Sequence, residues 1–290
     1  MLSKIDQQLM LPDGRKLGFA EYGDPQGKPI FYFHGWPSSR LSGQDLGPIA
    51  RRYGARLIAT DRPGMGLSDF QFGRRILDWP GDITALADYL KIGRFAVIGT
   101  CAGAPYVAAC AFKIPERLTR AAIVSGLSPF NAPKIGENLP AHLRRLRFAC
   151  KRTPWLMRFF LSRWRGFARR NPEGFLAWSF ARFSKTELSL LTRPSVKRTY
   201  IDCFLEANRS GTRGTTWEMA LLSGHWGFDL NHISVPVHLW HGEEDRAAPP
   251  AMGRYIANTI PNCRARFIPG EGHTTLFINH EAEIFGVLTS

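Results

Sequence analysis

The order of apolar and polar positions changes character along the chain. Short apolar, β-branched or aromatic runs alternate with longer stretches of helical periodicity, which is typical of parallel strands joined by helices. The pattern predicts strands at Lys16–Tyr22, Ile30–Phe33, Arg56–Thr60, Arg94–Ile98, Arg120–Ser125, Val235–Trp240 and Arg264–Ile268. It predicts helices at Ser39–Tyr53, Asp78–Leu90, Ala104–Phe112, Pro249–Thr259 and Thr275–Leu288. Early turn signals at residues 12–14 and 24–27 favour an opening antiparallel hairpin, so we expect an α/β protein with a mainly parallel sheet.

This rhythm is interrupted between about residues 131 and 231, where the pattern is helical throughout. Helices are predicted there at Leu139–Cys150, Pro154–Arg169, Pro172–Phe183, Pro194–Asn208 and Thr215–Leu222. Three of them begin with Pro, which is favoured in the first turn of a helix. We therefore predict a helical lid at residues 131–230, inserted into a core made of residues 1–130 and 231–290.

The composition is that of a soluble globular protein, with 44% hydrophobic and 21% charged residues among 290. No apolar run reaches the eighteen or so residues of a membrane span. Lys4 and Asp6 interrupt the first residues, where a signal peptide would need an apolar core. We expect a cytoplasmic protein.

The net charge of +14 is concentrated in the predicted lid. Residues 131–230 hold 18 Lys and Arg against 7 Asp and Glu, and they also hold five of the eight Trp and nine of the twenty Phe. One interpretation is amphipathic helices that pack their aromatic residues inward and expose a solvated basic face. The other is a docking surface for an acidic carrier protein or a membrane. We expect no nucleic-acid partner.

A strand that runs into a helix carries the clearest chemical signal. The segment from Phe95 leads into Gly99-x-Cys101-x-Gly103, and a helical pattern follows. Small residues two positions before and after a central side chain allow the sharp turn that exposes a nucleophile at the positive end of a helix. The five-residue pattern alone is weak, but its place between strand and helix makes it specific.

With this motif the chain resembles the α/β-hydrolase superfamily over nearly its full length. Further segments agree, and nucleophile, acid and His follow in the family's order. They are His34-Gly35-Trp36-Pro37 at the place of the oxyanion loop, Asp61-Arg62-Pro63-Gly64-Met65-Gly66-Leu67-Ser68 after the next strand, the acid-bearing segment His241 to Pro249, and the His-bearing segment Gly270-Glu271-Gly272-His273.

The resemblance implies roles for five residues. Cys101 would be the nucleophile, His273 the general base and acid, and Asp245 the carboxylate that orients His273. The backbone N–H groups of Trp36 and Ala102 would form the oxyanion hole. A neighbouring His⁺ and a helix N-terminus both favour the thiolate form of a Cys.

Other candidates have a structural interpretation. Glu243 and Glu244 are alternatives to the acid, but only Asp245 matches the motif position. His34 and His241 are expected to support their turns, as is Asp61. The five Cys form no CxxC pair, the remaining His show no metal-ligand spacing, and no strand is followed by Gly-x-Gly-x-x-Gly. We expect no metal and no cofactor.

The Cys at position 101 departs from the commonest family pattern, which has Ser. Dehalogenases and epoxide hydrolases of this superfamily have Asp at this position. Because position 101 is Cys, those two activities are disfavoured. A Cys at the nucleophile position resembles the pattern of dienelactone hydrolases, polyhydroxyalkanoate synthases and some chain-releasing thioesterases. A Ser replaced by Cys through engineering is the alternative to a native Cys, and an inactive relative is disfavoured because the acid and the His both remain.

The expected function is hydrolysis of an ester, thioester or lactone of an apolar acyl substrate through an acyl-Cys intermediate. A thioester intermediate stays reactive towards amines and alkoxides, so an acyltransferase or chain-releasing thioesterase is the alternative within this class. A non-catalytic ligand-binding receptor on the same fold is the alternative from a different class. Turnover of an activated ester distinguishes the two classes.

Overall fold

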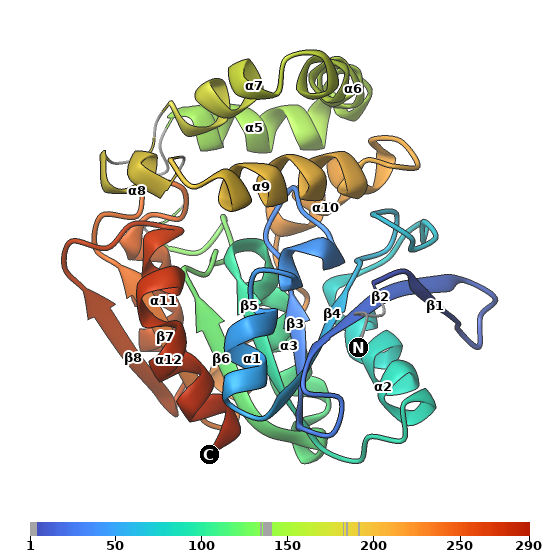
Figure 1. Cartoon of the computed structure of the whole chain (residues 1–290), viewed down its shortest axis with the longest axis vertical. Helices are drawn as coiled ribbons and strands as arrows, with labels where there is room; N and C mark the ends of the chain where they lie inside the picture. Colours follow the sequence, from blue (N-terminus) through green and yellow to red (C-terminus); the bar gives the residue numbers. More distant parts are fainter. Residues whose placement is uncertain (1–4, 134, 136–140, 182, 184, 191) are drawn as a thin grey trace.

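An eight-stranded, mostly parallel sheet forms the centre of the computed structural model, which describes all residues except 1–4, 134, 136–140, 182, 184 and 191 (Figure 1). The strand order is β1-β2-β4-β3-β5-β6-β7-β8. The first two strands form an antiparallel hairpin, β2 pairs antiparallel with β4, and every later pairing is parallel. This confirms the predicted fold class, including the helical insertion between β6 and β7.

All seven predicted strands are present, with shifts of one or two residues at their ends. The strands are β1 (Gln7–Met10), β2 (Lys16–Gly23), β3 (Lys28–Phe33), β4 (Ala55–Thr60), β5 (Phe95–Thr100), β6 (Leu118–Val124), β7 (Val237–Gly242) and β8 (Cys263–Ile268). The sequence pattern missed β1, which is four residues long, half polar and alternately half-buried and exposed at the sheet edge. By contrast β5 is almost wholly buried, because a parallel strand is covered on both faces.

Helices cover both faces of the sheet. In the core they are α1 (Gly47–Arg52), α2 (Trp79–Tyr89), α3 (Ala104–Lys113), α11 (Pro250–Thr259) and α12 (Thr275–Thr289), with short 3₁₀ turns at η1 (Arg40–Gly43), η2 (Ile76–Asp78), η3 (Cys101–Gly103), η4 (Pro115–Arg117) and η5 (Leu230–His232). The prediction of one helix at Ser39–Tyr53 was wrong, because the chain forms η1 and then α1 with a break between them. Pro48 lacks the N–H and cannot continue a helix that began at residue 39, but it fits the first turn of α1.

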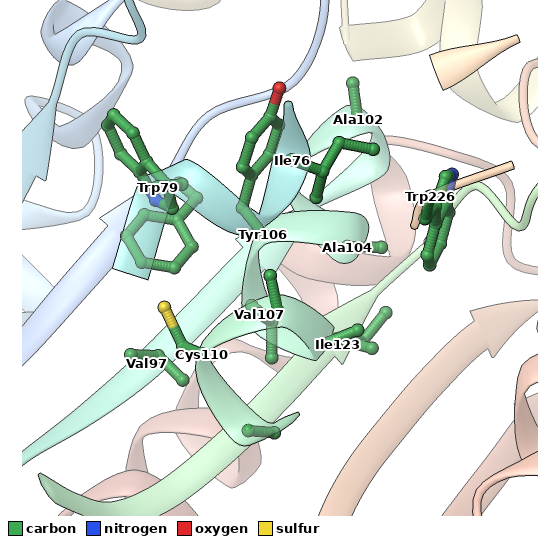
Figure 2. Close-up of a cluster of buried hydrophobic side chains, with 14 of the residues drawn as sticks. Ile76, Trp79, Val97, Ala102, Ala104, Tyr106, Val107, Cys110, Ile123 and Trp226 are labelled. Atoms are coloured by element: carbon green, nitrogen blue, oxygen red, sulfur yellow. The ribbon is translucent and has the colours of Figure 1, made fainter. Parts of the chain in front are cut away.

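Two hydrophobic layers flank the sheet. Leu46, Ile49 and Phe285 of α1 and α12 pack on one face. Helices α2, α3 and α11 pack on the other face with the larger cluster, part of which Figure 2 shows around Tyr106, Val107 and Cys110 of α3. The parallel strands all end at the edge of the sheet that faces the inserted helices (Figure 1).

The insertion contains α5 (Ala141–Arg152), α6 (Pro154–Arg170), α7 (Pro172–Phe180), α8 (Lys185–Leu190), α9 (Pro194–Ala207) and α10 (Arg213–Leu222). The predicted helix start at Leu139 lies outside the described residues. The sequence pattern missed α8 and extended α7 by three residues to Phe183. A small aromatic core of its own holds the insertion together, in which Phe175, Phe180 and Phe204 are buried.

Buried arginines connect the insertion to the core. Arg40 donates to Asp61 Oδ2 at 2.8 Å and to Glu206 Oε1 of α9 at 2.7 Å. Arg62 Nε lies 2.6 Å from Glu218 Oε1 of α10, and both side chains are inaccessible to solvent.

The second of these contacts is part of a larger buried cluster. Arg74 also pairs with Glu218, and the Tyr106 hydroxyl donates to Glu218 Oε2 at 2.8 Å. Burial by itself raises the pKa of Glu218, but Arg62 and Arg74 outweigh this effect and hold the pKa below its ordinary value. A single carboxylate therefore pairs with two buried guanidinium groups at the boundary between the lid and the core.

Within the described residues, no helix is long and apolar enough to cross a membrane.

We predict that Glu218→Gln lowers the free energy of unfolding by about 3–5 kcal/mol at neutral pH, because two buried cations lose their only carboxylate among the described contacts. The matched control is Glu173→Gln in α7, whose exposed pair with Lys197 at 3.0 Å is worth about 1 kcal/mol or less. Denaturant titration measures both.

The pH dependence of the free energy of unfolding also tests whether the Glu218 carboxylate stabilises the fold. Because the folded-state pKa of Glu218 is lowered, its stabilisation is present above the unfolded-state pKa of about 4.3 and is lost as the pH falls through the folded-state value. The difference between wild type and Glu218→Gln should therefore narrow on acidification. Equal losses in the two variants at pH 7 would contradict the assignment.

Candidate active site

The turn from β5 into α3 places Cys101 at the end of the sheet nearest the lid. Cys101 has φ = +54°, a left-handed conformation that is strained for any residue other than Gly. The glycines on either side make the turn sterically feasible. A Cβ at Gly99 would lie 2.5 Å from the Gly103 carbonyl oxygen, and one at Gly103 would lie 2.2 Å from that of Phe33. The Cys101 side chain is half-buried.

Asp245 lies in the loop after β7 with its side chain fully buried. Its Oδ1 accepts hydrogen bonds from the backbone N–H groups of Ala247 at 2.9 Å and Ala248 at 2.8 Å. Its Oδ2 is 2.7 Å from His273 Nδ1. The neighbouring Glu243 and Glu244 are exposed, so Asp245 is the carboxylate of this segment that faces His273.

His273 follows β8 and is held through its backbone and its ring. The Ser125 hydroxyl donates to the His273 carbonyl oxygen at 3.0 Å. Burial alone would lower the pKa of His273, but the Asp245 carboxylate and the nearby Cys101 outweigh burial and raise the pKa well above its ordinary value. The structure thus brings Cys101, His273 and Asp245 together from three separate loops.

His241 is hydrogen-bonded to the loop that carries Asp245. Its Nε2 lies 2.8 Å from the Ala248 carbonyl oxygen, which can only accept, so this nitrogen carries the proton. Burial lowers the pKa of His241, although Asp245 partly opposes this effect. A Cβ on Gly253 would lie 2.4 Å from the His241 ring, so the ring packs directly on α11. These contacts fit a neutral His241 that stabilises the conformation of the loop.

The segment from His34 to Pro37 lies against Cys101. A Cβ built on Gly35 would be 3.4 Å from the Cys101 Cβ. The Trp36 indole Nε1 donates to the Thr215 carbonyl oxygen of α10 at 2.8 Å, so the side chain is tied to the lid. Ala102 is fully buried immediately after Cys101. The loop that carries Trp36 and the residue Ala102 therefore both lie next to Cys101.

The peptide unit between Gly35 and Trp36 has a fixed orientation. Its carbonyl oxygen accepts from Arg62 Nη2 at 3.0 Å and from His34 Nδ1 at 2.8 Å, while Arg62 Nη1 donates to the His34 carbonyl oxygen at 2.6 Å. In a planar trans peptide the N–H points opposite to the C=O. The Trp36 N–H therefore points away from Arg62, and Arg62 and His34 together determine its direction.

Burial lowers the pKa of His34 far below its ordinary value, and the charge of Arg62 lowers it further. His34 is therefore neutral and donates from Nδ1. This agrees with a supporting role in the turn rather than a direct chemical one.

Three residues at the site were missed by sequence analysis. They are Arg62, which orients the Gly35–Trp36 peptide; Glu187 of α8, whose Oε1 accepts from the Thr274 backbone N–H at 2.8 Å; and Tyr200 of α9. The pKa of Tyr200 rises to about 12, mainly through burial and to a smaller extent through the charge of Cys101. Only Arg62 had a sequence signal, as the second residue of the Asp61–Ser68 motif.

The remaining candidates lie away from this cluster. No group of three or more His, Cys, Asp and Glu suited to a metal ion occurs in the part of the chain that the structure describes. His225 and Asp229 pair at the surface, and His280 lies near Glu271. A surface hollow of about 630 Å³ between β1 and α2, lined by Leu9, Pro80 and other residues, shares none of them with the cluster.

Comparisons with known proteins agree with the fold. Residues 28–279 match the family described as alpha/beta hydrolase fold. A non-heme chloroperoxidase of Streptomyces lividans is 25% identical over 260 residues, which cover 85% of this chain and 86% of the relative. A bifunctional esterase/perhydrolase of Acinetobacter calcoaceticus is 24% identical and covers 90% of each chain.

Solved structures share the fold at lower identity. An esterase from Exiguobacterium antarcticum superposes with a TM-score of 0.71 at 18% identity, covering 98% of this chain and 97% of the other. An enol-lactonase from Burkholderia xenovorans gives a TM-score of 0.70 at 18% identity, with 97% of each chain covered.

We predict that Arg62→Lys lowers kcat for an activated ester such as p-nitrophenyl butyrate by at least about tenfold with KM little changed. Lys lacks the planar fork with which Arg62 holds the His34 and Gly35 carbonyls while pairing with Glu218. A misplaced N–H donor costs transition-state stabilisation, for which removal of one donor gives about 10²–10³. Arg56→Lys in β4, the strand that precedes Arg62, is the matched control; its partner Glu21 is half-buried, and kcat should be unchanged.

A second comparison separates positioning from stability. Glu218→Gln breaks the same buried pair but leaves the two loop carbonyls with Arg62. It should lower stability more than kcat, whereas Arg62→Lys should do the reverse. If kcat in both variants simply follows the fraction of folded protein, Arg62 has no positioning role.

Proposed function

This chain belongs to the alpha/beta hydrolase fold family, and on that premise we propose that it cleaves an ester, thioester or lactone through a covalent acyl intermediate on Cys101. The hydrolase class follows from the family; the nucleophile, the bond and the roles of individual residues are the proposal. The observation that carries it is the alignment of Cys101, His273 and Asp245, with His273 Nδ1 2.7 Å from the buried carboxylate.

In the proposed first half-reaction the Cys101 sulfur attacks the acyl carbon. The raised pKa of His273 favours a proton on the imidazole, so a thiolate–imidazolium pair is the reactive form. The C–S bond forms, the carbonyl electrons move to oxygen, and His273 Nε2 then gives its proton to the leaving oxygen or sulfur as that bond breaks. Asp245 stabilises the imidazolium through Nδ1 and keeps Nε2 directed at the reaction.

The second half-reaction releases the acyl group. His273, now neutral, takes a proton from water as the water oxygen attacks the thioester, and the Cys101 sulfur leaves as thiolate while His273 keeps that proton. The products are a carboxylic acid and the starting thiolate–imidazolium pair. If an amine or alcohol takes the place of water the same steps give acyl transfer, which is the alternative outcome of this site.

The negative oxygen of each tetrahedral intermediate would be bound by the N–H groups of Trp36 and Ala102. Two features support this assignment. Gly35 brings the loop against Cys101, and Arg62 and His34 hold the Gly35 carbonyl so that the Trp36 N–H points the other way. The Ala102 N–H lies in the first turn after the nucleophile, where the helix end favours negative charge.

A thiol nucleophile favours water over peroxide as the second substrate. The relatives named above include a chloroperoxidase and an esterase/perhydrolase, whose names refer to peroxide chemistry. Peroxide oxidises a reactive Cys thiolate to sulfenic acid and on to irreversible products. We therefore place this chain with the esterase and lactonase activities of the fold rather than with perhydrolysis.

The substrate is proposed to have an apolar acyl group. Two aromatic side chains support this: Trp36, in the loop that lies against Cys101 and bound to Thr215 of α10, and Tyr200 of α9, whose pKa is raised by burial and by Cys101. Such side chains bind alkyl or aryl groups and exclude water. A ligand-binding receptor without turnover is the alternative from another class, and it predicts no ester hydrolysis at all.

Cys101 should react with iodoacetamide faster than the other four Cys near neutral pH. Burial raises the pKa of Cys150 and of Cys203 to about 12 and that of Cys263 to about 11, and it raises the pKa of Cys110 further, so these thiols stay protonated. Mass spectrometry after a brief labelling reaction gives the distribution. Even labelling of all five sites would show that Cys101 is not an activated nucleophile.

Cys101→Ser should lower kcat/KM for an activated ester at least about tenfold, a barrier rise of about 1.4 kcal/mol, because a hydroxyl needs His273 to remove its proton during the attack. Cys101→Ala should abolish covalent turnover. Cys110→Ser, the buried thiol on the next helix, controls for general thiol effects, and melting temperatures establish that each variant is folded.

The Ser variant also separates the two origins of the Cys. A Cys101→Ser form clearly faster than the Cys form would mean that position 101 is a replaced Ser. That outcome would leave His273 and Asp245 in their proposed roles and remove the argument for thioester chemistry.

A further inference from the structure

The outer helices of the lid carry an unusual concentration of positive charge. Residues 141–170, which form α5 and α6, contain ten Lys and Arg and no Asp or Glu. Eight of these side chains are exposed: Arg144, Arg145, Lys151, Arg152, Arg158, Arg163, Arg169 and Arg170. In Figure 1 both helices lie beyond α9 on the side of the lid away from the sheet.

Large aromatic side chains project from the same two helices into solvent. Phe148 of α5 is 64% exposed, and Trp155, Phe159 and Phe160 of α6 are 69%, 58% and 57% exposed. Both helices have a separate inward side, with Leu143 and Cys150 of α5 and Leu161 and Ala168 of α6 buried. The exposed aromatic residues are therefore additional to those that hold the lid together.

The exposed aromatic and basic residues of α6 cover the half of the helix that lies opposite its buried residues Leu161 and Ala168. Trp155 and Phe159 are four residues apart and thus one turn apart, and Arg163 continues the same row. Phe159 and Phe160 are in edge contact, with ring centroids 6.0 Å apart. The resulting surface, formed by Trp155, Phe159, Phe160 and the flanking Arg158 and Arg163, is called the α6 aromatic–basic face below.

We propose that the α6 aromatic–basic face, together with Phe148 and the basic residues of α5, docks the protein on a membrane surface that contains anionic lipid. Helices that lie in a membrane interface combine Trp and Phe, which enter the headgroup region, with Lys and Arg, which remain at the lipid phosphates. Each basic residue near an anionic leaflet strengthens binding, and the cytoplasmic leaflet carries such lipids.

The shape and charge of the face favour a membrane over other occupants. Side chains that project from the outer half of a convex helix need a deformable surface or a matching groove, and a bilayer supplies a deformable surface. A second copy of this chain would bring two strongly positive surfaces together, at a cost from like-charge repulsion. An acidic protein would satisfy the arginines but would need its own apolar groove for four aromatic rings.

Docking through this face is independent of the proposed catalytic residues. In Figure 1, α9 lies between the outer lid helices and the sheet, and the described hydrogen bond from Trp36 to the lid goes to Thr215 of α10. The inference can therefore hold or fail whatever reaction the site performs. It adds a location at which an apolar acyl substrate would be encountered.

Vesicle flotation with the full chain tests the proposal. The probes are vesicles of phosphatidylcholine alone and vesicles with roughly 30% phosphatidylglycerol, at an ionic strength of about 0.1 M. We expect at least about tenfold stronger binding to the anionic vesicles, and loss of most of this preference at about 1 M salt, where the screening length falls to about 3 Å.

Two variants locate the binding surface. The triple variant Trp155→Ala, Phe159→Ala, Phe160→Ala should lose at least about tenfold in vesicle affinity through lost insertion, and Arg158→Gln with Arg163→Gln should lose about tenfold through lost charge. The matched controls change exposed residues of the core: Phe72→Ala with Tyr89→Ala, and Arg51→Gln with Arg52→Gln. Ester turnover without vesicles should be unchanged in all four, which also reports that each is folded.

Several outcomes would overturn the proposal. Absence of binding, equal binding to both vesicle types, or equal losses in the face variants and the controls would each do so. Binding to polyglutamate that depends on the face, without binding to anionic vesicles, would indicate an acidic protein partner instead. Concentration-dependent dimerisation abolished by the triple variant, without vesicle binding, would assign the face to a second copy of the chain.

Discussion

The close approach of the β5–α3 turn to the neighbouring strand is the constraint on which the site depends. The space for this turn exists only because Gly99 and Gly103 have no side chains, since a Cβ on Gly103 would collide with the Phe33 carbonyl oxygen. That clearance allows Cys101 to adopt φ = +54° at the head of α3. Because β3 pairs with β5 in the sheet, the loop that leaves β3 reaches Cys101. Cys101 and the loop of residues 34–37, the proposed nucleophile and oxyanion loop, are thus positioned by one packing contact.

Buried ion pairs connect the loops around Cys101 to the lid. Arg62 holds two carbonyl groups of the oxyanion loop with one side of its guanidinium and pairs with Glu218 of α10 through Nε. Arg40 connects Asp61 to Glu206 of α9 in the same way. A buried guanidinium group without a counter-charge is destabilising. Glu206 and Glu218 of the lid each supply a carboxylate to a buried Arg of the core, and the same ion pairs hold the lid helices against the core. The orientation of the Trp36 N–H and the seating of α10 therefore depend on the same residue.

The lid has two sides with different physical character. Its inner side places Tyr200, Glu187 and Thr215 beside the loops that carry Cys101 and His273, so it contributes to the site. Its outer side is basic and aromatic. The two interpretations of the lid composition concern different residues. Phe175, Phe180 and Phe204 are buried in the lid core, whereas Trp155, Phe159 and Phe160 are exposed and belong to the surface for which docking is proposed.

The sequence by itself determined the α/β architecture, seven of the eight strands and the helical insertion, because hydrophobic periodicity reports which faces are buried. It also named Cys101, His273 and Asp245, since each lies in a local motif at a strand end. Only the tertiary structure decided which distant groups meet. The edge strand β1 is too short and polar to give a periodic signal, and the break before α1 depended on Pro48. Arg62 and Glu187 make hydrogen bonds that join residues 27 to 87 positions apart, and Cys101 affects the pKa of Tyr200 from another element. No local pattern encodes such contacts, because they form only when distant segments pack together.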